Sequence, residues 1–163
     1  MRETTLCYIR RDTQVLMLHR TKKQGDANHD KWIGIGGGIE PGETPDACLL
    51  REVREETGLV LTSYRYRGVI NFYSDRWEDE IMHLYTADGF TGSLIECDEG
   101  ELEWIEWAKL IDLTLWEGDL IFLRLIEQDA PFFRLDLRYE GEHLAAAVLD
   151  GVPMKLAKEA NSK

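Results

Sequence analysis

The sequence has few cysteines and no pattern that would assemble them into a framework. Its three cysteines, Cys7, Cys48 and Cys97, are odd in number, widely spaced and without histidines at metal-ligand spacing. A disulfide-rich secreted scaffold and a structural zinc site are therefore not expected. We interpret all three side chains as free thiols packed in the interior.

Long apolar runs are also missing. No stretch of about 18 apolar residues occurs, and the N-terminal MRETTLCYIRRD lacks the apolar segment of a secretory signal. The 163 residues are 44% hydrophobic and 31% charged, which is typical of a globular domain. We expect a cytoplasmic protein without a membrane partner, formed by a single domain over residues 1–155 and a flexible tail at 156–163.

Positive charge is scarce. The chain has 19 Lys and Arg against 31 Asp and Glu, so its net charge is -12 at pH 7, and the acidic excess lies mainly in residues 72–163. Such a surface repels DNA and RNA, and we expect no nucleic-acid partner. A small phosphorylated substrate remains compatible, because a bound cation reverses the local charge.

One stretch carries most of the chemistry that the sequence offers. Residues 32–59 read WIGIGGGIEPGETPDACLLREVREETGL, a glycine-rich loop that leads into a short helix. Thr44 suits the N-cap, Pro45 the first helical position and Gly58 the left-handed position after the last turn. These signals predict a helix over residues 45–57.

The two sides of this helix are predicted to differ. The apolar spacing predicts a buried stripe made of Ala47, Leu50, Val53 and Thr57. The other side carries Arg51 and three carboxylates, Glu52, Glu55 and Glu56. Like charges one turn apart cost about 0.2–0.5 kcal/mol per pair, which a divalent cation such as Mg2+ or Mn2+ would relieve. The alternative is a solvated acidic surface that Arg51 partly neutralises.

The spacing of this stretch resembles the Nudix box at every defined position. Gly37 is followed after five residues by Glu43 and, after seven more, by the run REVREETGL at 51–59. With so many fixed positions, chance agreement is negligible. The chain is therefore identified as similar to the Nudix hydrolases. This resemblance implies an α/β fold in which a mixed central β-sheet lies between helices as an α/β/α sandwich.

The resemblance also implies the metal ligands. Two or three divalent cations, Mg2+ or Mn2+, would be held by Glu52, Glu55 and Glu56. The carbonyl of Gly36 would add a ligand. Nudix enzymes often place one further catalytic carboxylate on a loop in the region of residues 95–107. The register before the next tryptophan favours Glu99 here. The alternatives are Glu96 and Asp98.

Other residues of the box region are expected to hold the loop and the phosphates. By the resemblance, Arg51 and Glu43 form a buried catalytic-site pair that fixes the loop against the helix. Gly37 and Gly38 let the backbone approach phosphate oxygens closely. Gly38 stands where many MutT-like boxes have lysine, which removes one positive contact. Lys23, in the polar segment before the box, could reach a phosphate.

A closer resemblance extends beyond the box. The strand LMLHR, the segment WEGD, the PFF segment and the terminal YEGEHL are similar to the MutT-type branch, which sanitises oxidised purine nucleoside triphosphates such as 8-oxo-dGTP. This implies that Trp116 stacks on the base and that Asp119 recognises its edge. Gly118 replaces the first of two adjacent acids of the vertebrate enzymes, and Ile33 replaces an asparagine. Base recognition is therefore expected to differ.

The remaining segments complete the expected sheet. Apolar, β-prone runs predict a hairpin from residues 4–10 and 14–20, and two longer strands from 59–73 and 81–90. Residues 108–115 favour a short helical turn. The apolar run at 116–128 favours a helix on the second side of the sheet. A second hairpin is predicted from residues 132–139 and 144–149.

Taken together, the resemblance implies attack of water at the β-phosphorus of a nucleoside triphosphate, which releases the monophosphate and pyrophosphate. Glu52 or Glu99 would take the proton of the water. Two alternatives stay open: a Nudix hydrolase of another nucleoside diphosphate derivative, and a binding module that has lost turnover. The intact box glutamates weigh against the second alternative. Both a monomer and a homodimer are compatible with the sequence.

Overall fold

The computed structural model describes residues 1–21 and 28–156. Its elements lie in the chain order β1 (Arg2–Arg11), β2 (Gln14–His19), β3 (Trp32–Ile33), β4 (Ile35–Gly38), α1 (Pro45–Thr57), β5 (Val60–Ser74), β6 (Glu80–Thr91), β7 (Glu101–Glu106), the 3-10 helix η1 (Trp107–Asp112), α2 (Asp119–Glu127), β8 (Phe133–Glu140), β9 (His143–Leu149) and β10 (Val152–Pro153). Lys23 and residues 157–163 of the predicted tail lie outside the described residues.

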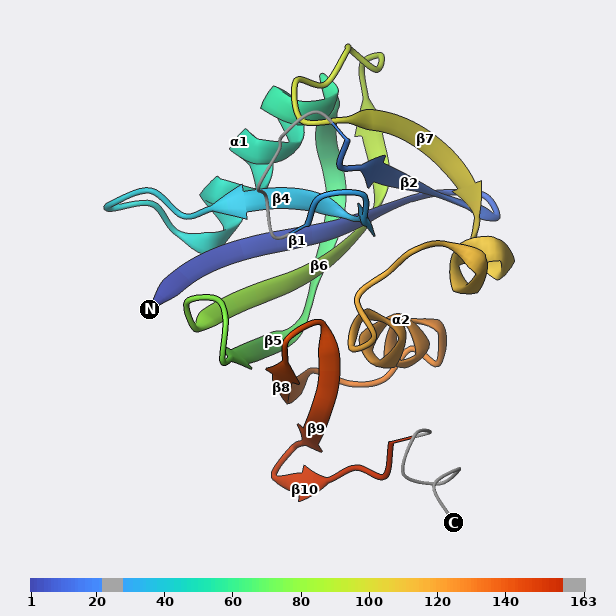
Figure 1. The fold of residues 1–163 in the computed structure, drawn as a ribbon. Coiled ribbons are helices and arrows are strands. Elements are labelled where there is room, and N and C mark those ends of the chain that lie inside the picture. Colours follow the sequence, from blue (N-terminus) through green and yellow to red (C-terminus); the bar gives the residue numbers. More distant parts are fainter. Residues whose placement is uncertain (22–27, 157–163) are drawn as a thin grey trace.

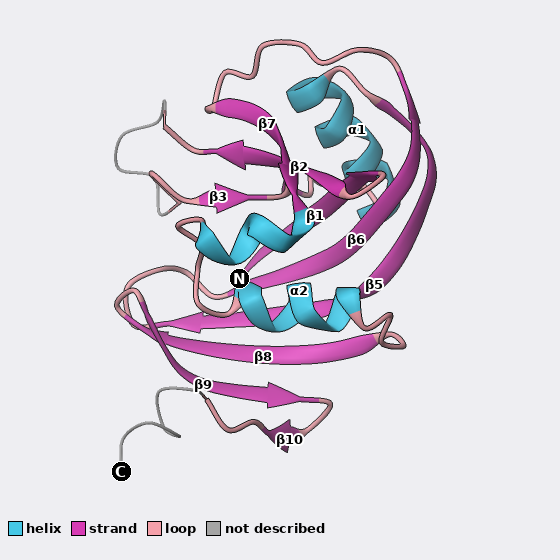
Figure 2. Ribbon diagram, turned by 90° about the vertical axis from the view of Figure 1, so that its right-hand side faces the viewer, coloured by secondary structure: helices cyan, strands magenta, loops and turns pink. Residues whose placement is uncertain are grey.

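The strands form one mixed sheet of ten, in the order β10-β9-β8-β5-β6-β1-β2-β3, with β4 paired to β1 and β7 paired to β2. β1 pairs in parallel with β6 and antiparallel with β2 and β4. Figures 1 and 2 show α1 and α2 on opposite sides of the layer that contains β1 and β6. The expected α/β fold with a mixed central sheet is confirmed.

Alternation along β1 explains why the sheet is covered on both sides. Leu6 and Tyr8 belong to a core that α2 covers through Phe122. Cys7 and Ile9 point the other way, into a core that α1 covers. Successive side chains of a strand point to opposite faces, so an almost continuous run of buried residues in β1 needs a helix on each side. All three cysteines are buried, as predicted.

The predicted limits of α1 are confirmed. The helix runs from Pro45 to Thr57, the Oγ1 of Thr44 accepts a hydrogen bond from the backbone N–H of Ala47, and Gly58 adopts φ 80° at the C-terminal end. A side chain at Gly58 would be strained in this left-handed conformation. Local capping chemistry was therefore sufficient to place both ends.

The predicted buried stripe of α1 is only half right. Val53 and Thr57 are buried, but Ala47 and Leu50 are exposed, and Cys48 and Leu49 are buried instead. The helix is rotated so that Leu49 and Val53 face the sheet. This rotation also buries Glu56, a residue that the apolar pattern had placed on the solvent side.

The two predicted hairpins and the two long strands are present, but some strand pairs were not predicted. β1 with β2, β5 with β6, and β8 with β9 form antiparallel pairs. β5 also pairs in parallel with β8, which the sequence did not indicate. Part of the expected glycine-rich loop is strand β4, because pairing with β1 overrides the low strand propensity of glycine. No helix in the described part of the chain is long and apolar enough to cross a membrane.

Candidate active site

β4 brings the glycine-rich segment into contact with both β1 and α1. Gly36 pairs with Leu6, and a Cβ at Gly36 would lie only 1.9 Å from the carbonyl oxygen of Thr5. A Cβ at Gly37 would lie 2.6 Å from the carboxyl carbon of Glu52. A side chain at Gly36 would push the strand away from β1, and one at Gly37 would displace the Glu52 carboxylate, so the glycines set how closely backbone and carboxylate approach. A Cβ at Gly38 would meet nothing within 4 Å.

Arg51 is the hub of the charged network on α1. Its guanidinium donates to both carboxylate oxygens of Glu43, at 2.7 and 2.9 Å, and to the carbonyl oxygen of Gly38 at 3.1 Å. It also donates to Glu52 at 2.9 Å and to Glu55 at 3.2 Å. The hydrogen bonds that Glu43 accepts from Arg51 lower the pKa of Glu43 to about 2. The structure thus places Arg51 and Glu43 in a pair that ties the loop to the helix.

Glu56 has no arginine or lysine partner in the described part of the chain, and its carboxyl group instead meets the carboxyl of Glu99 and the backbone of Gly36. Its side chain is 9% exposed, and its Oε2 is buried with no hydrogen bond among the described residues. Burial raises the pKa of Glu56 to about 9, and the nearby carboxyls of Glu99 and Glu52 add to this shift, while the backbone of Gly36 opposes it. Burial also raises the pKa of Glu52, against the influence of Arg51.

Glu99 approaches this group from the loop before β7. Its Oε2 accepts a hydrogen bond from Arg20 at 2.9 Å, and its charge acts on both Glu52 and Glu56. The alternatives Glu96 and Asp98 are both exposed. Of the three acids proposed for this loop, Glu99 is the one near the helix carboxylates. We call Glu52, Glu55, Glu56 and Glu99 the carboxylate face.

The carboxylate face fits a divalent cation in its chemistry. Within residues 1–21 and 28–156, no three acidic, histidine or cysteine side chains form a ready metal-binding arrangement, because Arg51 and Arg20 hold several of these carboxylates. A buried acceptor without a partner is nevertheless left on Glu56. Burying an unpaired acidic oxygen is costly unless a proton or a cation meets it. Hard oxygen donors of this kind are those that Mg2+ and Mn2+ prefer.

A second group of polar residues lies at the start of α2. The indole N–H of Trp116 donates to the side-chain oxygen of Asn28 at 2.7 Å, and the ammonium of Lys31 lies 4.7 Å from the centre of the Trp116 ring. Tyr139 contacts this ring edge-on, with ring centres 5.4 Å apart. We call these residues, together with Asp119, the Trp116 cluster.

Asp119 is the acid of this cluster. It is 5% exposed, and burial raises its pKa to about 8, although the charge of Lys31 opposes the shift. Burial therefore favours the protonated form of this carboxyl group, which can donate a hydrogen bond. Gly118, which precedes it, is buried and its N–H donates to the hydroxyl of Tyr139 at 2.7 Å. A Cβ at Gly118 would lie 2.6 Å from the Leu137 side chain, so a second acid there would not fit without a shift.

The backbone connects the two groups. The N–H of Trp32 donates to the carbonyl oxygen of Thr114 at 2.9 Å, which ties β3 to the segment that leads into Trp116. β3 is followed directly by β4 and its glycines. Sequence reasoning did not identify Arg20 or Lys31 as parts of these groups. Their partners Glu99 and Trp116 are far away in the sequence, and no local pattern marks such contacts.

Comparisons with known proteins show which family and which fold the chain resembles. The model of the NUDIX domain family matches residues 1–127. An uncharacterised Nudix hydrolase, YvcI of Bacillus subtilis, is 30% identical over 124 residues, which cover 73% of this chain and 75% of the relative. The oxidized purine nucleoside triphosphate hydrolase of Danio rerio is 33% identical over 104 residues, which cover 63% and 66%. The structure of a mutator MutT protein from Bacillus halodurans superimposes with a TM-score of 0.82 at 22% identity, over 92% of this chain and 98% of that one.

Proposed function

Because the chain belongs to the Nudix family, we propose that it hydrolyses purine nucleoside triphosphates, above all oxidised ones such as 8-oxo-dGTP, to the monophosphate and pyrophosphate. The observation that carries this proposal is that residues 32–38 adjoin both groups of residues. Gly36 and Gly37 lie beside Glu56 and Glu52, and the N–H of Trp32 donates to the carbonyl oxygen of Thr114, two residues before Trp116. One group offers carboxylates for a phosphate-bound cation. The other offers an aromatic ring and a protonated acid for a base.

The carboxylate face would hold the metal. We assign Glu52, Glu55, Glu56 and Glu99 as carboxylate ligands, with the carbonyl of Gly36 as a further one. When bound, divalent cations such as Mg2+ supply the Lewis acidity that activates water and offsets phosphate charge. The buried, unpartnered Oε2 of Glu56 is the strongest support for this assignment.

The protein's own groups would orient and deprotonate the attacking water. Glu52 and Glu99 are the candidate general bases, because each carboxylate is held by an arginine and is only partly exposed. Arg51 would keep Glu52 in position while Glu43 holds Arg51 from the loop side. A positioned base of this kind contributes about 100-fold to 10,000-fold to the rate of proton transfer reactions.

The glycine strand would receive the phosphates. Gly37 carries no side chain beside the carboxylate of Glu52, and the space around Gly38 is open, so phosphate oxygens could approach the backbone there. We keep Lys23 as a proposed phosphate contact, although it lies outside the described residues. One lysine near the phosphates is sufficient for the proposal, because the bound metal supplies the rest of the positive charge.

The Trp116 cluster would recognise the base. The Trp116 ring offers a stacking surface, on which Lys31 rests in this structure. A protonated Asp119 could donate a hydrogen bond to a purine acceptor such as a ring nitrogen or a keto oxygen. This donor would favour bases that present an acceptor at that edge. We further propose a cytoplasmic enzyme that acts on free nucleotides, without nucleic-acid or membrane partners, as a monomer or a homodimer.

A substrate panel tests the proposal. Purified protein with Mg2+ would be assayed for pyrophosphate and monophosphate release from 8-oxo-dGTP, the ordinary dNTPs and NTPs, and nucleotide sugars and dinucleoside polyphosphates. The expected result is the highest kcat/KM for an oxidised purine triphosphate, with pyrophosphate as product. Activity confined to the diphosphate derivatives would overturn the substrate assignment but keep the chemistry. Lack of turnover on all substrates would overturn both and favour a binding module.

One observation favours the second candidate, hydrolysis of another nucleoside diphosphate derivative. The base-reading positions differ from the vertebrate pattern, with Gly118 in place of an acid and Ile33 in place of asparagine. A Cβ at position 118 would collide with the side chains of Leu137 and Tyr139, so the packing around Gly118 leaves no room for an acid. The panel separates the two candidates directly, because they predict different products.

A further inference from the structure

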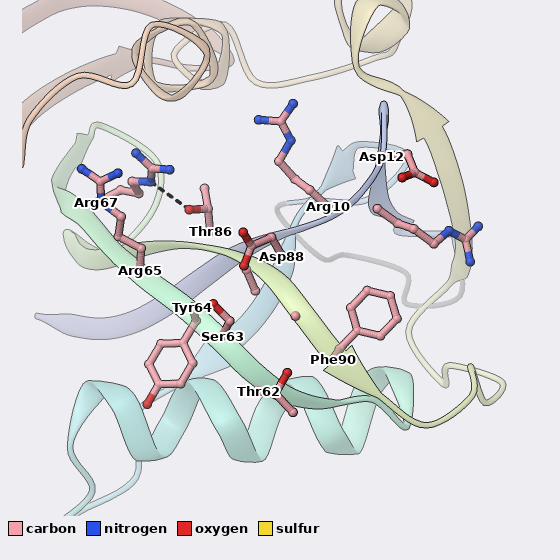
Figure 3. A pocket seen from close by; sticks show the side chains of 13 residues that line it. Arg10, Asp12, Thr62, Ser63, Tyr64, Arg65, Arg67, Thr86, Asp88 and Phe90 are labelled. Carbon is pink, nitrogen blue, oxygen red and sulfur yellow. Dashed lines mark hydrogen bonds between the residues drawn. The ribbon is translucent and has the colours of Figure 1, made fainter.

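A groove opens where β1 and β6 separate. The two strands pair in parallel as far as Ile9 and Ala87. β1 then turns back into β2 after Arg11, whereas β6 continues to Thr91 against β5. The gap between them is a groove of about 940 Å³ that both strands and β5 line (Figure 3).

This groove is separate from the candidate active site. Gly36 of the glycine strand pairs with Leu6, and Arg10 lies four residues further along β1, about 13 Å away in an extended strand. Among the described residues that line the groove, none belongs to the carboxylate face or the Trp116 cluster. The groove also carries the opposite charge, as the next observations show.

Three arginines enter the groove from the side that faces α2: Arg10, Arg65 and Arg67 (Figure 3). Arg65 and Arg67 share one acceptor, the Oδ1 of Asp129, at 2.9 and 2.6 Å. Arg10 has no carboxylate oxygen within 4.0 Å in residues 1–21 and 28–156. Arg11 also lines the groove, as do Asp12 and Asp88, so four arginines stand against these two acids and the Asp129 that pairs with Arg65 and Arg67. Positive charge is in excess here, in a protein whose net charge is -12.

The positive groups are held in place before any ligand arrives. The guanidinium of Arg10 lies 4.3 Å from the centre of the Trp107 ring, a stacked position that limits its freedom. The Nε of Arg67 donates to the Oγ1 of Thr86 at 2.8 Å, so the hydroxyl of this buried threonine remains a donor. Side chains that are already ordered lose less entropy when they bind.

The backbone is also irregular at this place. β5 carries three register shifts between Leu61 and Gly68, along the segment that holds Arg65 and Arg67. Bulges of this kind bend a strand, redirect side chains and are frequent beside binding sites. A Cβ at Gly89 would lie 2.8 Å from the Oγ1 of Thr62, so glycine is required where β5 and β6 approach in the groove.

We propose that this groove binds the phosphate group of a small anion through Arg10, Arg65 and Arg67. Guanidinium groups bond phosphate oxygens in a two-pronged manner, and a threonine hydroxyl adds a neutral donor. The phosphate can belong to an inorganic anion such as pyrophosphate or to a nucleotide. The inference goes beyond the proposed function, because the groove uses none of the residues assigned to hydrolysis and stands even if the substrate differs.

Calorimetric titration of the metal-free protein tests the proposal. With EDTA present, no turnover occurs and the carboxylate face repels anions. Any binding at the Trp116 cluster is the same in wild type and in a groove variant, so the difference between the two measures the groove. Inorganic pyrophosphate and dATP would be titrated separately into wild type, Arg10→Gln and Arg138→Gln, at constant ionic strength. Arg138 is a matched control, because its guanidinium lies over the ring of Tyr73 elsewhere on the surface. Melting temperatures would show that both variants fold.

Wild type is expected to bind one phosphate-bearing anion. The affinity of Arg10→Gln for this anion should be lower by roughly tenfold or more, and Arg138→Gln should bind as wild type does. A larger loss of dATP affinity than of pyrophosphate affinity in Arg10→Gln would identify a nucleotide as the source of the phosphate, and the reverse order an inorganic anion. Absence of binding to wild type, or equal affinities of wild type and Arg10→Gln, would overturn the site. An equal loss in Arg138→Gln would show general charge attraction and also overturn it.

Discussion

The carboxylate face and the Trp116 cluster both contain a buried acid, but they accommodate it differently. Glu56 lies among other carboxylates, with its Oε2 unpartnered, and Asp119 lies among aromatic groups with Lys31 nearby. Burial raises both pKa values, to about 9 and about 8. Like charges around Glu56 invite a cation, whereas the apolar surroundings of Asp119 favour a neutral donor. The same side-chain chemistry therefore supports metal binding at one place and base recognition at the other.

The strongest test of the contrast is removal of the carboxylate charge on α1. Glu56→Gln and Glu52→Gln should each lower kcat/KM by at least about 100-fold, since even residues behind metal ligands contribute about 10-fold to 100-fold. Both variants should fold normally, because Gln keeps the shape of the side chain. Steady-state kinetics with Mg2+ and thermal melts would measure this. Glu96→Gln, at an exposed acid of the same region, is the control, and near wild-type turnover in both α1 variants would refute the metal assignment.

Asp119 should give activity a pH dependence that the carboxylate face does not explain. If the protonated carboxyl binds the base, kcat/KM should fall about tenfold as pH rises from 7 to 9, through the pKa of about 8. Asp119→Asn should lose this alkaline decline, because its amide donates at every pH. A decline that persists in Asp119→Asn while the exposed control Asp112→Asn matches wild type would exclude Asp119 as its source.

The same group links stability to pH. Because the folded pKa of Asp119 lies above the unfolded value of about 3.9, its stabilising contribution is complete below that value and is lost as pH rises through about 8. The free energy of unfolding should therefore fall toward alkaline pH more steeply in wild type than in Asp119→Asn. Urea titrations at several pH values measure the difference, and parallel pH curves would contradict the neutral buried acid.

The Trp116 ring should affect substrate affinity more than turnover. Trp116→Ala should raise KM several-fold, because aromatic stacking is worth about 0.5–1.5 kcal/mol, and leave kcat nearly unchanged. Trp116→Phe keeps a stacking face but loses the hydrogen bond to Asn28, so its KM should lie between those of wild type and Trp116→Ala. Trp77→Ala, at an exposed tryptophan outside the cluster, is the control. A loss in kcat alone would place Trp116 in the carboxylate chemistry instead.

The smallest expected effect concerns the Arg51–Glu43 pair in acid. The folded pKa of Glu43 is lowered to about 2 from an unfolded value of about 4.3, so its contribution is present above the latter and is lost as pH falls toward 2. Glu43→Gln should melt at a lower temperature than wild type at pH 7, and the difference should vanish near pH 2. Glu106→Gln, at an exposed acid, should show no such convergence. A constant difference at all pH values would contradict the ion pair.

Local sequence signals were sufficient where the structure depends on neighbouring residues. The caps at Thr44 and Gly58 placed both ends of α1, and the spacing from Gly37 to Leu59 identified the family. Alternating and apolar runs located the hairpins, because turn and strand propensities act over a few residues. The odd number and wide spacing of the three cysteines argued against a disulfide framework, and all three are buried as expected.

Local sequence signals failed where contacts between residues distant in the sequence determine the structure. β4 is a strand because β1 pairs with its glycines, and the rotation of α1 follows from how Leu49 fits the sheet rather than from the apolar repeat. The pairs of Arg20 with Glu99 and of Lys31 with Trp116 both join residues more than seventy positions apart in the sequence. No local pattern encodes such contacts, since packing across the sheet selects them.

The most direct test of the central claim is a Mn2+ titration of the protein without substrate, followed by the EPR signal of the free ion. Wild type and Asp119→Asn should bind Mn2+ with the same affinity, whereas Glu56→Gln should bind at least about tenfold more weakly. This result would separate a metal-binding carboxylate face from a Trp116 cluster that acts on the base. Equal Mn2+ affinity in Glu56→Gln and wild type would contradict the assignment of the buried carboxylate as a metal ligand.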